Sequence, residues 1–235
     1  RFCSHFARRR SLDEQTKLEF LGMSKNVAIV GATGAVGTEM LRCLETRNFP
    51  VGKLHALASS ASAGKMVQFK DREITLEALE GFDFAGIDVA LLAVDTDIAM
   101  DCAARATKAG ATVIDNSSAF RMKANVPLVV PEVNGALLEE RPRLIANPNC
   151  VAAIMVMALA PLQNLARISR VHAASYQAAS GAGLPAMREL EDSTRAYLAG
   201  QKFEPKVLPH PYAFNFFSHN TPIDPETGYN GEETK

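Results

Sequence analysis

The stretch that decides the fold is NVAIVGATGAVG, residues 26–37. Its first part, Asn26 to Val30, is a short apolar run rich in β-branched residues, which is typical of a buried strand. Gly31, Gly34 and Gly37 follow, and the segment from Thr38 to Arg47 has the amphipathic pattern of a helix. The sequence therefore predicts a strand, a sharp glycine turn and a helix in direct succession.

Strands and helices alternate beyond this unit. Further strands are predicted at 54–58, 89–94, 112–115, 126–130 and 144–146, with a helix at 98–108. Continuous apolar strands that alternate with helices indicate a parallel sheet covered on both faces. The expected fold class is α/β, with a Rossmann-type doubly wound parallel sheet followed by part of an α+β substrate or dimerisation domain.

A second domain is expected to begin near residue 150. The segment VAAIMVMALAPLQNL, 151–165, predicts a nearly all-apolar helix, a strand follows around 170–177, and a helix with a polar face spans 184–198. From Gly200 onward the pattern is irregular. We therefore divide the chain into an extension, 1–23, a dinucleotide-binding domain, 24–149, and an incomplete catalytic or dimerisation domain, 150–235.

Composition and charge narrow the possible partners to small molecules. The chain has 235 residues, 47% of them hydrophobic, and a net charge of −1, without any basic block interleaved with aromatic residues. This excludes the phosphate-neutralising stripe that nucleic-acid binding requires. The longest apolar stretch, Val151 to Leu162, is shorter than the roughly 20 residues of a membrane span and contains Pro161, so we expect no membrane segment.

The cysteines and the N-terminal residues bear on localisation. Cys3, Cys43, Cys102 and Cys150 form no CxxC pair and have no metal-ligand spacing, which favours a reducing compartment and no metal site. Residues 1–10 contain four arginines and no acidic residue, like the tail of an organellar transit peptide; the alternative is upstream sequence before Met23. We expect a cytoplasmic protein, or a plastid protein if residues 1–22 are a transit peptide.

The glycine turn predicts a dinucleotide site. At the end of a strand and the start of a helix, small residues let backbone N–H groups approach a pyrophosphate. An NAD enzyme would place an acidic residue about 20 residues further on. Here no carboxylate lies between Gly52 and Lys70, whereas Ser59, Ser60, Ser62 and Lys65 offer hydroxyls and a cation. This favours NADP; the alternative is a flexible serine loop.

Cys150 is the candidate nucleophile. It follows Asn147, Pro148 and Asn149 and directly precedes the apolar helix. The positive end of a helix favours the thiolate needed for attack, and its N–H groups can hold an oxyanion. The alternative, an inert buried thiol, suits Cys43 and Cys102, which lie among apolar neighbours on predicted helices.

Arg121 is the candidate phosphate ligand. It lies in DNSSAFRM, 115–122, directly after a predicted strand. A guanidinium in such a loop can fork onto a phosphate, although most loop arginines are solvated surface residues.

Several blocks together resemble the aspartate-semialdehyde dehydrogenase family in order and spacing. They are GATGAVG, VIDNSSAFR, VPLVVPEVN, IANPNC, SYQAASGAG and EETK, between Asn26 and Lys235. In that family a cysteine thiolate forms a thioacyl enzyme with aspartate 4-semialdehyde or its acyl phosphate, with hydride passing to or from NADP. The resemblance also implies lysine, threonine and methionine biosynthesis, and a homodimer or homotetramer for the complete protein.

The resemblance assigns roles to particular residues. Cys150 would be the acylated nucleophile and Gln177 would orient the substrate. Arg121 and Lys235 would hold phosphate, and Glu232 would pair with the substrate's ammonium group. The cofactor contacts would be Gly31, Thr33, Gly34, Ala35, Val36, Gly37, Ser59, Ser62, Ser180 and Gly181.

The sequence departs from the family pattern at some positions. Ala61 stands where the family usually has an arginine, and Val151 and Ala152 stand where it has Ser and Thr. The family's substrate arginine and its acid/base histidine belong to a later segment, so we expect this chain as given to turn over substrate very slowly. The alternatives are a non-catalytic NADP-binding remnant and an N-acetylglutamyl-phosphate reductase, in which Glu232 would have no evident use.

Overall fold

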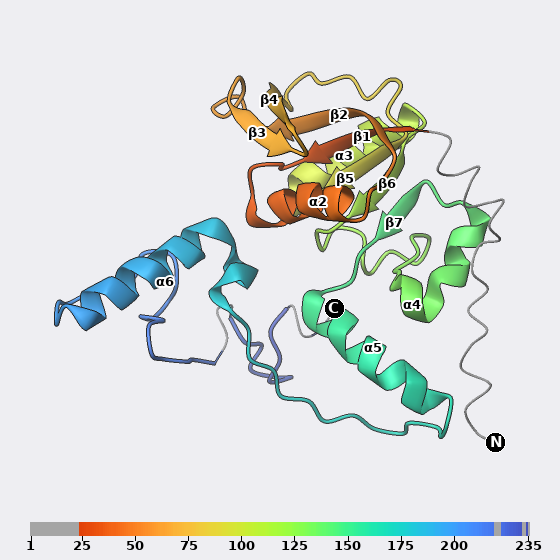
Figure 1. Ribbon diagram of the computed structural model, residues 1–235. Helices are drawn as coiled ribbons and strands as arrows, with labels where there is room; N and C mark the ends of the chain where they lie inside the picture. Colours follow the sequence, from red (N-terminus) through yellow and green to blue (C-terminus); the bar gives the residue numbers. More distant parts are fainter. Residues whose placement is uncertain (1–23, 219–221, 232–233, 235) are drawn as a thin grey trace.

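The computed structural model describes residues 24–218, 222–231 and 234. The elements are β1 (Lys25–Val30), α2 (Ala35–Thr46), β2 (Val51–Ala58), β3 (Met66–Phe69), β4 (Arg72–Ala78), β5 (Val89–Leu92), α3 (Thr96–Lys108), β6 (Thr112–Asp115), α4 (Pro131–Asn134), η1 (Gly135–Glu140), β7 (Leu144–Ala146), α5 (Cys150–Gln163), η2 (Ala179–Ala182) and α6 (Gly183–Leu198) (Figure 1). The expected extension at 1–23, Glu232 and Lys235 lie outside the described residues.

The strands form one seven-stranded sheet in the order β3-β4-β2-β1-β5-β6-β7. All neighbours are parallel except the antiparallel pair of β3 and β4. The chain runs from β1 outward to β2 on one side and returns to β5 on the other side, so the sheet is doubly wound. The predicted Rossmann-type α/β fold is confirmed.

Each face of the sheet has its own hydrophobic core. Val27 and Ile29 of β1 pack with Leu41 of α2, whereas Ala28 and Val30 pack into the cluster that includes Cys102 of α3. The four β1 side chains are fully buried because the strand is covered on both sides. This explains why β1 is a continuous apolar run and not an alternating one.

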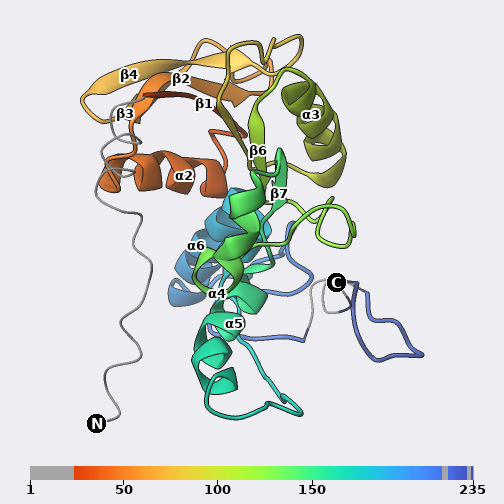
Figure 2. The same ribbon diagram turned by 90° about the vertical axis from the view of Figure 1, so that its right-hand side faces the viewer.

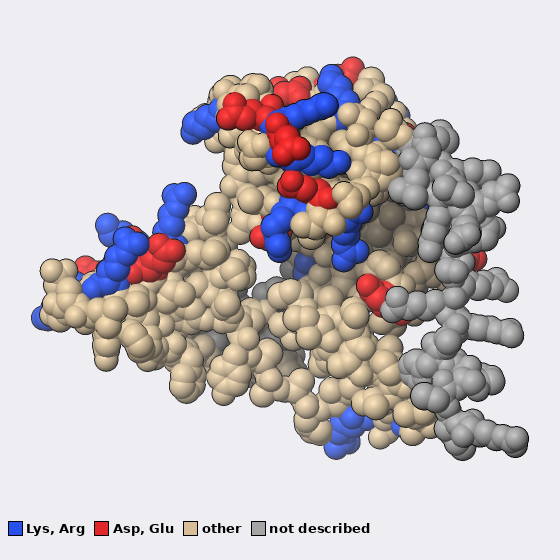
Figure 3. Space-filling view, viewed as in Figure 1, with Lys and Arg blue, Asp and Glu red and all other residues tan. Residues whose placement is uncertain are grey.

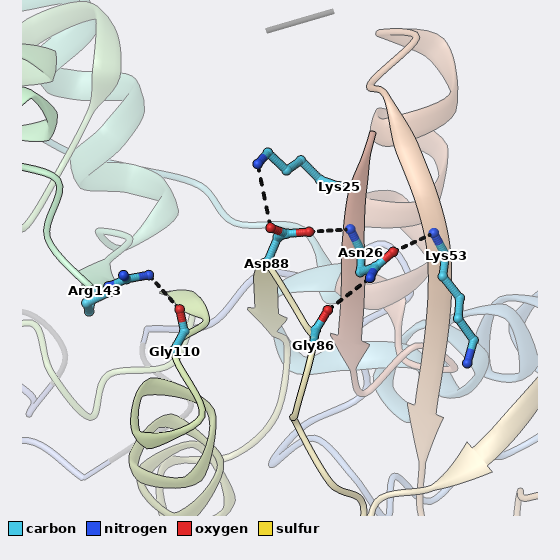
Figure 4. Close-up of polar contacts among 7 residues, drawn as sticks. All are labelled: Lys25, Asn26, Lys53, Gly86, Asp88, Gly110 and Arg143. Atoms are coloured by element: carbon cyan, nitrogen blue, oxygen red, sulfur yellow. Dashed lines mark hydrogen bonds and ion pairs between the residues drawn. The ribbon is translucent and has the colours of Figure 1, made fainter. Parts of the chain in front are cut away.

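The edge of the sheet at the amino end of its strands is stabilised by polar contacts (Figure 4). The Asn26 amide group of β1 donates to the Gly86 carbonyl at 2.9 Å and accepts from the Lys53 backbone at 3.1 Å. The Asn26 backbone donates to the carboxylate of Asp88, which also pairs with Lys25. These contacts tie β1, β2 and the approach to β5 together, leaving the carboxyl ends of the strands to form a site.

Some sequence expectations were wrong. No strand forms at 126–130, where Leu128 makes only an isolated bridge with Ala146, and none forms at 170–177. A β-rich pattern becomes a strand only where a neighbouring edge supplies hydrogen bonds, and in the described part of the chain 170–177 has no such neighbour. The hairpin of β3 and β4 was missed, although Ile74, Leu76 and Ala78 alternate with polar residues in the period-2 pattern of a strand.

The segment after β7 lies on one side of the sheet in both ribbon views (Figures 1 and 2). Helix α5 contains no charged residue and no buried one, and its surface is uncharged over its whole length in the space-filling view (Figure 3). Pro161 lies inside its last turn and does not end the helix. Helix α6 begins beside α2 and packs on η2. No described helix is both long and apolar enough to cross a membrane.

Candidate active site at the carboxyl edge of the sheet

Parallel strands end at one edge of the sheet, and most of the candidate residues follow these ends. The glycine turn follows β1, Ser59 follows β2, Arg121 lies in the loop after β6 and Cys150 comes shortly after β7. The chain reverses direction across the sheet between β1 and β5, and open α/β sheets bind ligands in the crevice at such a reversal. The topology thus gathers these residues on one edge of the molecule.

The glycine turn requires glycine at two positions. Gly31 has φ +84°, and a Cβ on it would lie 2.3 Å from the Ala93 carbonyl oxygen. A Cβ on Gly37 would lie 2.1 Å from the Gly31 carbonyl oxygen, so α2 can approach β1 only without a side chain there. The amides of Thr33, Ala35 and Val36 make no hydrogen bond in the described part of the chain. These donors at the start of α2 suit an anionic pyrophosphate.

A hollow of about 400 Å³ extends from this turn along α2 to β3. Ala32 and Thr33 line its end at the turn, and Thr38, Leu41, Arg42, Glu45, Val67 and Gln68 line the rest.

The loop after β2 holds its serines in a tight turn. The Ser62 amide donates to the Ser59 carbonyl at 2.8 Å, and both residues reach the surface, as does Lys65. The structure adds a residue that sequence reasoning missed. The Ser60 hydroxyl donates to the Glu80 carboxylate at 2.8 Å, and this hydrogen bond lowers the pKa of Glu80. A carboxylate therefore lies beside the loop although none lies within it.

Arg121 connects the loops that follow β6 and β7. Its Nε donates to the Asn147 carbonyl and one terminal nitrogen donates to the Asn116 carbonyl, both at 3.0 Å. Asn147 adds a side-chain hydrogen bond to Asn116 at 2.5 Å and a backbone one to Asp115 at 2.8 Å. The guanidinium is half-buried and is not a solvated surface arginine. Three of its five N–H groups remain for a ligand.

Asp115 is the fully buried member of this hydrogen-bond network. Its side chain is fully buried and accepts from the Ser117 hydroxyl at 2.8 Å and the Ser117 amide at 3.1 Å. Burial raises the pKa of Asp115, and the Ser117 hydrogen bonds and the Arg121 charge oppose this only in part. The carboxylate thus fixes the start of the loop that carries Arg121.

Helix α5 begins at Cys150, as expected, with Asn149 as its N-cap. The Asn149 side-chain oxygen accepts from the amides of Val151 at 2.8 Å and Ala152 at 3.3 Å. These amides were expected to be available for an oxyanion and are not, because the cap occupies them. The Cys150 amide has no hydrogen-bond partner among the described residues.

Gln177 lies beside Cys150 although 27 residues separate them. Its Nε2 donates to the exposed Cys150 thiol at 3.7 Å. The Ser180–Gly181 turn in η2 lies just beyond, since a Cβ on Gly181 would be 3.8 Å from the Gln177 side-chain oxygen. The structure therefore brings the predicted nucleophile and the predicted substrate-orienting residue together.

The other described thiols differ from each other. Cys102 is fully buried, and burial raises the pKa of its thiol to about 11. Cys43 was expected to be buried as well, but it is exposed on α2 because the core face of that helix is provided by Gly37 and Leu41. No group of three His, Cys, Asp or Glu side chains among the described residues is arranged to hold a metal ion.

Comparison with known proteins agrees with this arrangement. The model of the NAD binding domain of semialdehyde dehydrogenase matches residues 26–141, and that of the semialdehyde dehydrogenase dimerisation domain matches residues 159–235. The chain belongs to the semialdehyde dehydrogenase family. The two matches show that the chain contains a domain that binds a nicotinamide cofactor and a dimerisation domain.

Individual relatives carry a more specific name. An aspartate-semialdehyde dehydrogenase from Synechocystis is 47% identical over 84% of this chain. The crystal structure of aspartate semialdehyde dehydrogenase II from Vibrio cholerae matches 90% of the chain at 38% identity and a TM-score of 0.86. Aspartate semialdehyde dehydrogenase with NADP from Candida albicans matches 62% of the chain at 25% identity and a TM-score of 0.50. The chain spans 58%, 64% and 48% of these proteins, respectively.

Proposed function

We propose that this protein interconverts aspartate 4-semialdehyde and 4-aspartyl phosphate with NADP, through a thioacyl intermediate on Cys150. The observation that carries the proposal is the exposed Cys150 thiol at the start of α5 with Gln177 Nε2 at 3.7 Å. The names of the Synechocystis and Vibrio cholerae relatives support the substrate. The activity would belong to aspartate-family biosynthesis of lysine, threonine and methionine.

The chemistry of Cys150 follows from its position. The thiolate attacks the aldehyde carbon, forming a C–S bond, and the carbonyl oxygen becomes an oxyanion that the Cys150 amide and Gln177 Nε2 can hold. Loss of hydride from that carbon leaves a thioester. Phosphate then attacks the thioester carbon, the C–S bond breaks, and the acyl phosphate leaves with the thiolate restored. The family resemblance assigns Gln177 the role of orienting the substrate during these steps.

The substrate phosphate would bind to Arg121, whose unused N–H groups lie in the loop next to the Cys150 segment. The family resemblance assigns a second phosphate contact to Lys235 and an ammonium contact to Glu232. A doubly charged acyl phosphate and an α-ammonium group require such opposite charges.

The residues of the glycine turn fit a dinucleotide. Gly31 and Gly37 leave no room for a Cβ, and Thr33, Ala35 and Val36 have amides available, so the turn with Gly34 would hold the pyrophosphate. Ser59, Ser62 and Lys65 would hold the 2′-phosphate of NADP, and Ser180 and Gly181 would also contact the cofactor. Bound NADP supplies the hydride acceptor, and the crystal structure of the Candida albicans relative with NADP is consistent with this choice.

The domain limits and the assembly state are part of the proposal. The cofactor domain would span 24–149 and the catalytic or dimerisation domain 150–235. The dimerisation model that matches 159–235 favours a homodimer, or a homotetramer built from dimers.

A covalent-capture experiment tests the proposal without requiring turnover. The protein is mixed with aspartate 4-semialdehyde and NADP, quenched with acid, and examined by intact-mass and peptide mass spectrometry. We expect one aspartyl adduct on the Cys150 peptide, with an equal amount of NADPH, and a shorter adduct lifetime when phosphate is added. The Cys150→Ala variant should bind NADP equally well and form no adduct. An adduct elsewhere, or none despite cofactor binding, would refute the mechanism.

A further inference from the structure

The backbone of Gln177 has an anchor that the proposed function does not use. The Tyr212 hydroxyl donates a hydrogen bond to the Gln177 carbonyl oxygen. Residues 170–178 form no helix or strand and are exposed. Among the described residues, no other backbone group from 170 to 177 makes a hydrogen bond. The Tyr212 contact is therefore the hydrogen bond that holds the backbone of this stretch in place near Cys150.

Tyr212 is itself held by the packing around α6. Its ring meets the Phe217 ring edge to face, with the centroids 5.6 Å apart. Both rings pack against a small core formed by Ala179, Ala186 and Leu208, with Leu190 beside it. This core joins η2, α6 and the 208–217 segment, so the tyrosine hydroxyl has a defined position.

The segment that leads to Tyr212 is tied to α6 by a buried carboxylate. Glu189 of α6 accepts the amides of Lys206 at 2.5 Å, Val207 at 2.7 Å and Leu208 at 2.9 Å. Burial acts to raise the pKa of Glu189, but the three amide hydrogen bonds outweigh it and the pKa is lowered. Glu189 is therefore ionised near neutral pH and holds the segment in place.

We infer that Tyr212 is a positioning residue for Gln177, because its hydroxyl sets the place from which Gln177 Nε2 reaches the Cys150 thiol. This inference rests on the proposed roles of Cys150 and Gln177. An unanchored backbone at 177 would spread the amide group over many positions, and a donor stabilises a developing charge only if it is held in place. Tyr212 thus acts through Gln177 and does not touch the reacting atoms.

The test uses Tyr212→Phe, which removes the hydroxyl and keeps the ring that packs on Phe217. The rate of Cys150 alkylation by iodoacetamide is followed from pH 6 to 9, with the exposed Cys43 as the reference thiol in the same molecule. Near neutral pH we expect the Cys150 rate to fall about two- to tenfold, the range expected for loss of one hydrogen bond. Cys43 should react at the wild-type rate in this variant at every pH.

Two further variants make the result decisive. Tyr197→Phe is the matched control, because the Tyr197 ring packs on Phe214 and its hydroxyl has no partner among the described residues; it should react like wild type. Gln177→Ala should slow Cys150 at least as much as Tyr212→Phe, and the double variant should be no slower than Gln177→Ala alone. An additive double variant, or an unchanged rate in Tyr212→Phe, overturns the inference. If Gln177→Ala also reacts like wild type, the proposed role of Gln177 fails with it.

Discussion

At the scale of single residues, the described cysteines occupy three different environments. Cys150 is exposed at the start of a helix, Cys43 is exposed on the side of one, and Cys102 is buried against the sheet. Helix position and burial act on the ionised form of a thiol in opposite directions. The three thiols should therefore react at distinct rates.

We predict that iodoacetamide labels Cys150 first, Cys43 second and Cys102 last. The pKa of Cys102 is raised to about 11, so its thiolate is nearly absent at neutral pH and increases only as the pH rises toward that value. Peptide mass spectrometry after short labelling at pH 7 measures the order. Labelling of Cys43 ahead of Cys150 would contradict the proposed activation by the start of α5, and Cys43→Ser provides the control that removes the competitor.

Glu80 gives a second prediction at this scale. Its lowered pKa keeps it ionised, and its hydrogen bond to Ser60 places a negative charge beside the proposed site for the 2′-phosphate. Glu80→Gln should therefore increase the affinity for NADP about two- to fivefold and leave that for NAD unchanged, the modest size reflecting solvent screening. Calorimetric titration with both cofactors measures this, and the control is Glu73→Gln on β4, the strand that precedes Glu80. An equal change for NAD and NADP would show that Glu80 does not face the 2′ position.

At the scale of elements, asparagine side chains join loops at both edges of the sheet. Asn26 links β1 to the Gly86 carbonyl and the Lys53 amide at the amino edge. Asn147 links the β7 loop to Asn116 at the carboxyl edge, directly before the Cys150 segment. Of the two asparagines, only Asn147 lies in the loop that carries the Cys150 thiol.

This comparison separates stability from positioning. Asn26→Ala and Asn147→Ala should each lower the free energy of unfolding by about 1–2 kcal/mol through lost hydrogen bonds, as measured by urea denaturation. Only Asn147→Ala should also slow formation of the Cys150 adduct, by about tenfold, since the loop that carries the thiol becomes looser. Equal adduct rates in the two variants would mean that the Asn147 contacts stabilise the fold without positioning Cys150.

At the scale of the whole molecule, the two regions differ in how they are covered. The sheet has cores on both faces, whereas α5 has no buried residue and leaves Ile154 73% exposed. An apolar helix surface that the rest of the molecule does not cover favours association with another molecule. The match of 159–235 to a dimerisation domain is consistent with pairing of this region.

We predict that the protein self-associates at micromolar concentration and that Ile154→Lys weakens this association at least tenfold, because a charge is costly to bury in an apolar contact. Sedimentation velocity over a range of concentrations measures the change. The control is Ile98→Lys. Ile98 is 43% exposed on α3, which packs on the sheet and not on α5, so this variant should associate like wild type. The same concentration dependence in both variants would place the interface elsewhere.

Local signals in the sequence determined the fold class, the glycine turn, most strands of the sheet and the helix that starts at Cys150, because periodicity, glycine spacing and capping involve neighbours along the chain. Only the tertiary structure decided that Gln177 lies against Cys150, Glu80 beside Ser60 and Tyr212 on the Gln177 carbonyl, contacts that span 27, 20 and 35 residues. It also decided that Cys43 is exposed and that 170–177 is not a strand. Such outcomes depend on which strands and helices become neighbours in space, and this is set by strand order and packing and not by any local pattern.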